Sequence, residues 1–128
     1  MNKLIIDAAS EKIFLMIITK DDIYNITKEN TKINYEKLTL IVKDFLYSKS
    51  LKLENINKIY VNRGPGSFAG IRNSLSIVKA FNISRKIDYY CYSFNDFKDQ
   101  KDIKYEHIPS LCDKLKIKKN LIKPIYLS

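Results

Sequence analysis

The residues best placed for chemistry lie in one turn, residues 64–70, which holds all three glycines of this 128-residue chain. Gly64, Gly66 and Ala69 match the GxGxxG/A spacing of a dinucleotide-binding turn between a strand and a helix. Such a site also needs an acidic residue at the carboxyl end of the next strand, to bind the ribose. Asp88 lies near the beginning of that strand instead. We therefore favour a turn that shapes a strand-to-helix junction over one that binds a dinucleotide, and we expect no cofactor.

A second candidate is Asp7, which ends an apolar run that reads as the first strand of a sheet. An ATP site built on such an Asp needs a glycine-bearing turn at the phosphates, and residues 8–11 contain no glycine. A metal-dependent nuclease would need several converging carboxylates, whereas Glu11, Glu36 and Asp44 fall on a turn or on a helix surface. We therefore expect Asp7 to be a strand-end residue satisfied by nearby amides or by solvent.

The sulfur and imidazole groups offer little further chemistry. Cys91 and Cys112 have no metal-ligand spacing, and His107 is the single histidine. Cys91 lies in an apolar strand, where free thiols are usually buried. The sequence therefore predicts no metal site.

The composition is that of a soluble globular protein of one domain's size, with 45% hydrophobic residues and a net charge of +9. No apolar run approaches the roughly 20 residues of a membrane span, and the opening residues read as a strand, so we expect a cytoplasmic protein without membrane contact. Only three of the 23 basic residues are Arg. The Lys, Ile, Asn and Tyr content fits a coding bias, so a solvated lysine surface is favoured over direct RNA binding.

The elements that must position these residues form an α/β fold. Apolar or alternating runs at residues 3–8, 12–19 and 23–26 predict three strands in an antiparallel meander. Residues 59–61 and 87–92 predict two more strands, joined through a helix by a right-handed crossover. The result is a five-strand mixed sheet of order 3-2-1-4-5 with helices packed on it. This is the ribonuclease-H-like architecture of the actin and sugar-kinase superfamily.

Both predicted helices carry more apolar surface than one sheet can cover. In residues 33–48 one stripe serves the core, and Ile33, Leu40 and Tyr47 collect on roughly the opposite side. In the helix that follows the glycine turn, which we expect to reach about Phe81, two adjacent apolar rows make a wide arc. The surplus predicts a protein partner. Residues 98–128 are charged and weakly periodic, so we divide the chain into a domain at 1–97 and a tail at 98–128.

The run GPGSFAGIR resembles the GPGSFTGxR signature of the TsaB (YeaZ) family, with Ala69 in place of Thr. The opening LIIDAASE and the closing KPIYLS are also similar to that family's sequences. The resemblance carries over the signature turn, namely Arg63, Gly64, Pro65, Gly66, Ser67, Phe68 and Gly70. It also implies the ribonuclease-H-like fold, with the family's second domain reduced here to about thirty residues.

This resemblance implies a non-catalytic subunit in the machinery that makes threonylcarbamoyladenosine on tRNA. In the family, TsaB binds the catalytic subunit TsaD through two helices of this domain, TsaE joins as an ATPase, and tRNA is contacted only indirectly. A homodimer through the same helices is a further expectation. The expected interface comprises Ile33, Leu40, Tyr47, Arg72, Leu75, Val78 and Phe81. The alternative function is a small ATP- or metal-dependent enzyme of the same superfamily.

Overall fold

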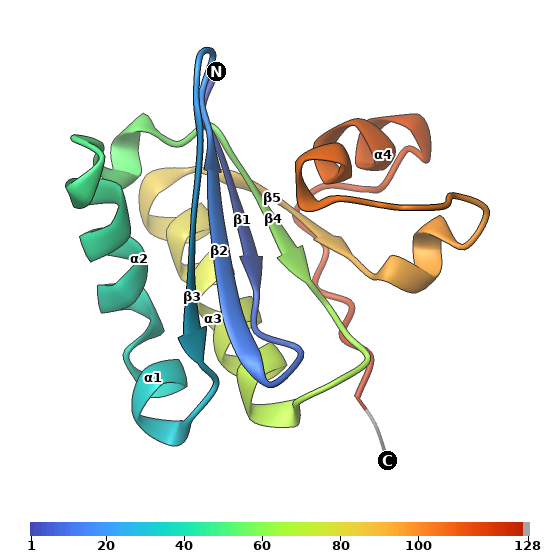
Figure 1. Ribbon diagram of the computed structural model, residues 1–128, viewed down its shortest axis with the longest axis horizontal. Coiled ribbons are helices and arrows are strands. Elements are labelled where there is room, and N and C mark those ends of the chain that lie inside the picture. The colour runs from blue at the N-terminus through green and yellow to red at the C-terminus, as the bar shows by residue number, and fades with distance from the viewer. Residues whose placement is uncertain (127–128) are drawn as a thin grey trace.

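The computed structural model describes residues 1–126, and a five-strand mixed sheet forms its centre (Figure 1). The strands are β1 (Lys3–Asp7), β2 (Lys12–Ile18), β3 (Ile23–Glu29), β4 (Lys58–Asn62) and β5 (Asp88–Tyr92). Their order is β3-β2-β1-β4-β5, as predicted. The first three strands pair antiparallel, and β4 pairs parallel with both β1 and β5. The closing apolar residues 125–127 also read as a short strand. Residues 121–126 are not in a strand, and residue 127 lies outside the described residues.

The helices are α1 (Lys32–Glu36), α2 (Leu38–Ser48), α3 (Phe68–Arg85) and α4 (Ile108–Lys114). Three short 3₁₀ turns, at Leu53–Asn55, Phe94–Phe97 and Tyr105–His107, complete the chain. The single helix predicted over residues 33–48 is interrupted at Lys37, where the backbone leaves helical geometry. The helix after the glycine turn runs four residues beyond Phe81, to Arg85.

The alternation of β1 divides the core into two layers on opposite faces of the sheet. Leu4 and Ile6 point to one face and pack with the buried residues of α2 and α3. Ile5 points to the other face, where it packs with Phe97, Ile108 and other residues of the C-terminal part. In Figure 1, α2 and α3 accordingly lie on one side of the sheet and α4 on the other. Part of the segment that we assigned to a tail thus packs on the second face of the sheet, against β1, β2, β4 and β5, while β3 is largely exposed.

Candidate functional site

The signature turn is a packing junction in which the backbone comes very close to other segments. A Cβ atom on Gly66 would overlap the carbonyl oxygen of Ala9, and one on Gly70 would overlap that of Ala8. Gly64 has a φ of +108°, and a Cβ there would overlap the carbonyl oxygen of Ile125. The glycines are therefore needed for contact with the β1–β2 turn and with the C-terminal segment.

Ser67 caps the start of helix α3. Its hydroxyl accepts a hydrogen bond from the Gly70 amide at 3.2 Å, which satisfies one of the free amides at the helix start. Its own amide donates to the carbonyl of Ala9 at 2.8 Å. The amides at the start of α3 are thus partly used by the protein itself, as in a structural junction.

Arg63, the first residue of the signature, connects three segments. Its backbone amide donates to Tyr92 at the end of β5, and its carbonyl accepts from the amide of Ile125, both at 2.7 Å. Its guanidinium donates to the carbonyl of Lys123 at 3.2 Å and forms an ion pair with Asp96 at 2.7 Å. The side chain is only 13% exposed. Arg63 therefore acts within the chain and offers little to a ligand.

Asp7 is 4% exposed, and Tyr105, which lies 98 positions later in the chain, contacts its carboxylate. One carboxylate oxygen accepts from the amide of Ala9 at 3.0 Å, and the other accepts from the hydroxyl of Tyr105 at 2.6 Å. The ring of Tyr105 stacks on Phe14 with the centroids 4.0 Å apart. Burial, followed by the Asp7 carboxylate, raises the pKa of Tyr105 well above its ordinary value, so the hydroxyl keeps its proton and remains a donor.

No local sequence pattern indicates the contact between Asp7 and Tyr105, because the two residues are 98 positions apart. The prediction that nearby amides satisfy Asp7 is correct for the amide of Ala9. It did not include the hydroxyl of Tyr105, which is the second donor. Within residues 1–126, no three His, Cys, Asp or Glu side chains are grouped so that they could hold a metal ion. Asp7 is thus an acceptor inside the fold, with its two oxygens already engaged.

The two cysteines lie inside the protein. Cys91 is 5% and Cys112 is 1% exposed, and both are free. Burial raises the pKa of Cys91 to about 11, although a backbone hydrogen bond at Lys123 and the charge of Arg63 oppose the shift. Burial, together with nearby Asp113, raises the pKa of Cys112 to about 12. Both thiols are therefore protonated at neutral pH and poor nucleophiles.

The outer side of α1 and α2 carries exposed apolar side chains, as the sequence predicted. Ile33 is 68%, Leu40 is 55% and Tyr47 is 79% exposed. The opposite stripe of α2, with Leu38, Val42, Phe45 and Leu46, is buried in the core. Because burying such side chains is favourable, this stripe is suited to another macromolecule.

The outer side of α3 differs from the prediction. Leu75, Val78 and Phe81 are at most 5% exposed, and they form part of the core. The expectation that these three residues face a partner is therefore wrong. The reason is that α3 touches α1, α2 and the sheet together, so its wide apolar arc is covered within the chain.

Other residues take the exposed positions on α3. Arg72 is exposed, and Ile83 is 72% exposed. Phe68, at the start of the helix, is 55% exposed and its ring lies 4.6 Å from that of Tyr126. The spacing 72, 76, 79, 83 along one helix face could have identified Ile83 from the sequence.

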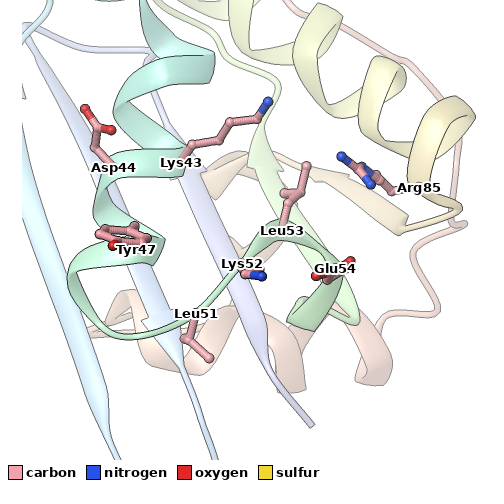
Figure 2. Close-up of a pocket in the computed structure, with 8 residues that line it drawn as sticks. All are labelled: Lys43, Asp44, Tyr47, Leu51, Lys52, Leu53, Glu54 and Arg85. Atoms are coloured by element: carbon pink, nitrogen blue, oxygen red, sulfur yellow. The ribbon is translucent and has the colours of Figure 1, made fainter.

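A groove lies where the end of α2 approaches the end of α3 (Figure 2). Its rim includes Tyr47 and Lys43 of α2 and Arg85 of α3, with Glu54 below them. A second groove lies between α1 and the start of α3 and is bordered by Arg72. The helices α2 and α3 therefore contact each other and run in the same direction (Figure 1).

Comparison with known proteins places these features in context. No family model matches the chain. The chain is 28% identical over 87 residues to the tRNA threonylcarbamoyladenosine biosynthesis protein TsaB of Buchnera aphidicola subsp. Schizaphis graminum, a match that covers 68% of this chain and 41% of that protein. The chain therefore spans less than half the length of the curated relative that it matches.

Two solved structures share the fold. YeaZ from Pseudomonas aeruginosa superposes with a TM-score of 0.66 and 20% identity, over 72% of this chain and 43% of that one. RuvC from Thermus thermophilus, solved with a Holliday junction substrate, superposes with a TM-score of 0.55 and 12% identity, over 98% of this chain and 83% of that one. The sheet and its helices thus have the ribonuclease-H-like fold expected from the strand order. Among the described residues, no helix is both long and apolar enough to cross a membrane.

Proposed function

The chain is a short member of the TsaB/YeaZ family, and from this we propose that it serves as a non-catalytic scaffold subunit in threonylcarbamoylation of tRNA. Its partner is a TsaD-like catalytic subunit, which it binds through the outer side of α1, α2 and α3. The signature turn positions α3 and ties the β1–β2 turn and the C-terminal segment to it. Contact with tRNA is made through the partner.

The observation that carries this proposal is the exposure of Ile33, Leu40 and Tyr47 on adjoining helices. If a partner covered these side chains, the removal of their apolar surface from water would stabilise the complex by roughly 25 cal/mol per Å². Ile83 of α3 adds a fourth large apolar side chain to the helical layer. Arg72 borders the groove between α1 and the start of α3, and Arg is enriched among residues that dominate binding energy.

The surroundings of Asp7 support a non-catalytic role. The carboxylate is buried, and the hydroxyl of Tyr105 occupies one of its oxygens. An ATP phosphate or a metal ion would have to displace Tyr105 together with its stacking on Phe14. The alternative of a small ATP- or metal-dependent enzyme therefore requires that the segment with Tyr105 moves away from Asp7. Isothermal calorimetry with ATP and Mg²⁺ distinguishes the two, because the scaffold is expected to give no binding heat.

The direct test is co-purification with a TsaD-like subunit encoded in the same genome. Leu40→Asp places a charge in the middle of the proposed surface, and we expect it to abolish co-purification. Leu115→Asp is the matched control, since Leu115 is similarly exposed, at 47%, and follows α4 on the other face of the sheet. Both variants should keep the thermal stability of the wild type, because solvent-exposed substitutions rarely change it by more than about 0.5 kcal/mol.

The two variants give a clear decision. Loss of the partner with Leu40→Asp and its retention with Leu115→Asp would support the helical surface. Retention with both variants would contradict it. Sizing of the isolated chain tests self-association, since a homodimer that uses the same surface would also dissociate with Leu40→Asp. A TsaE-like ATPase, added to the assembled pair, shows whether residues 98–128 allow a third subunit to join.

A further inference from the structure

Helix α3 carries positive charge on its exposed side and no acidic residue along its length. Its sequence, FAGIRNSLSIVKAFNISR, contains Arg72, Lys79 and Arg85. All three side chains are exposed. Arg85 in the last turn is favoured by the helix dipole, but Arg72 and Lys79 lie too far from that end to gain from it. The helix dipole therefore does not account for the positions of Arg72 and Lys79.

Arg72 and Lys79 project from the crest of the helix. Arg72 and Ser76 border the groove between α1 and the start of α3. The same two residues, together with Lys79, border a third groove on the other side of α3. A residue that borders both grooves lies between them and points away from the protein. The spacing 72, 76, 79, 83 places Ile83 on the same crest.

Among the described residues, no carboxylate forms an ion pair with a residue of this crest. Among residues 1–126, the ion pairs within 4.0 Å are Lys12–Glu29, Lys32–Glu36, Arg63–Asp96 and Lys119–Asp88. None of them includes a residue of α3. On α2, Lys43 reaches towards α3 while Asp44 points to the other side of its helix (Figure 2). Carboxylates do line the neighbouring grooves, with Glu36 in the groove that Arg72 borders and Asp44 and Glu54 in the groove at Arg85. None of them forms an ion pair within 4.0 Å with Arg72 or Lys79.

We propose that the partner which covers this surface presents carboxylates opposite Arg72 and Lys79, and apolar side chains opposite Leu40 and Ile83. This inference rests on the proposed function and adds the chemistry of the partner's contact surface. Opposite charges at the edge of an interface speed up association and fix its register. Burial of the exposed apolar side chains supplies affinity.

A nucleic acid is the other class of macromolecule that a basic crest could bind. Phosphate contacts need cations, and they make no use of aliphatic side chains. Here Leu40 and Ile83 are 55% and 72% exposed on the same helical layer as the cations. A protein with acidic and apolar side chains fits both features, whereas an RNA backbone fits only the cations.

The experiment measures the affinity of the TsaD-like subunit for a double variant, Arg72→Glu with Lys79→Glu. Like charges would then face each other, and we expect affinity to fall by about tenfold or more. The control is Lys98→Glu with Lys101→Glu, which changes the net charge equally at exposed residues outside the helical surface. For the wild type, raising the salt from about 0.1 to about 0.5 M should weaken binding, because the Debye length shortens. The double variant should lack this response.

The outcomes separate the two proposals. If the double variant binds like the wild type while Leu40→Asp does not bind, the partner's acidic surface is refuted and the scaffold function stands. If the double variant loses retention of tRNA but keeps its affinity for the TsaD-like subunit, the cations serve RNA and the inference is overturned. If the wild type does not bind the subunit at all, both proposals fail.

Discussion

Replacing Tyr105 with Phe removes the hydroxyl that caps Asp7 and leaves the rest of the contact in place. Phe can keep the stacking on Phe14, whose centroid lies 4.0 Å from the ring of Tyr105. The buried carboxylate, however, would lose its 2.6 Å hydrogen bond and keep only the amide of Ala9. The substitution thus isolates one charge-assisted hydrogen bond.

The magnitude follows from the burial of Asp7. A hydrogen bond to a charged group contributes about 1.5–3 kcal/mol, and a buried acceptor without its donor costs a similar amount. Because Asp7 is 4% exposed, water cannot readily replace the hydroxyl. We expect Tyr105→Phe to lower the free energy of unfolding by about 2 kcal/mol. With a urea m-value of about 2 kcal/mol per molar, the midpoint should fall by about 1 M.

Urea unfolding followed by far-ultraviolet circular dichroism measures this shift. Tyr47→Phe is the matched control, since Tyr47 is 79% exposed, and its free energy of unfolding should stay within about 0.5 kcal/mol of the wild type. In an Asp7→Asn background the cost of Tyr105→Phe should fall to about 1 kcal/mol, the contribution of a neutral hydrogen bond. An equal cost in both backgrounds, or a wild-type midpoint for Tyr105→Phe, would refute the reasoning.

Two further predictions concern the signature turn and the thiols. Gly66→Ala should lower the free energy of unfolding by about 1–3 kcal/mol in the same urea assay, because the added Cβ would overlap the carbonyl of Ala9. Stability should also fall as pH rises above about 8.5, where the thiols of the unfolded chain ionise. In the folded protein the pKa of Cys91 is raised to about 11 and that of Cys112 to about 12, so the unfolded state binds fewer protons.

Each of these has its own check. Ala69→Gly, at a neighbouring helical position, controls for the change in backbone freedom and should cost no more than about 1 kcal/mol. A wild-type urea midpoint for Gly66→Ala would show that the turn can relax. For the thiols, unfolding midpoints are compared at pH 7.5 and 9.5, and native and unfolded protein are alkylated with iodoacetamide. A midpoint that rises with pH, or rapid alkylation of the native protein, would contradict their burial.

The strand order could be predicted from the sequence because it depends on local patterns and on general rules of chain connection. Alternating or continuous apolar runs defined the strands, and the helical crossover between β4 and β5 predicted that these two strands pair in parallel. The exposed stripe of Ile33, Leu40 and Tyr47 was likewise visible, although the helix is broken at Lys37. Helical periodicity suffices there because α2 packs its buried stripe against the core and leaves the other stripe to solvent.

The tertiary structure decided how much of each apolar arc remains free, and which distant residues meet. Periodicity shows that Leu75, Val78 and Phe81 share a helix face, but it does not show that α1, α2 and the sheet all cover that helix. In the same way, no pattern near Asp7 indicates Tyr105, because a contact between residues 98 positions apart depends on the whole path of the chain. Sequence determines which side chains can share a surface, and only the packing of the elements determines whether that surface is exposed.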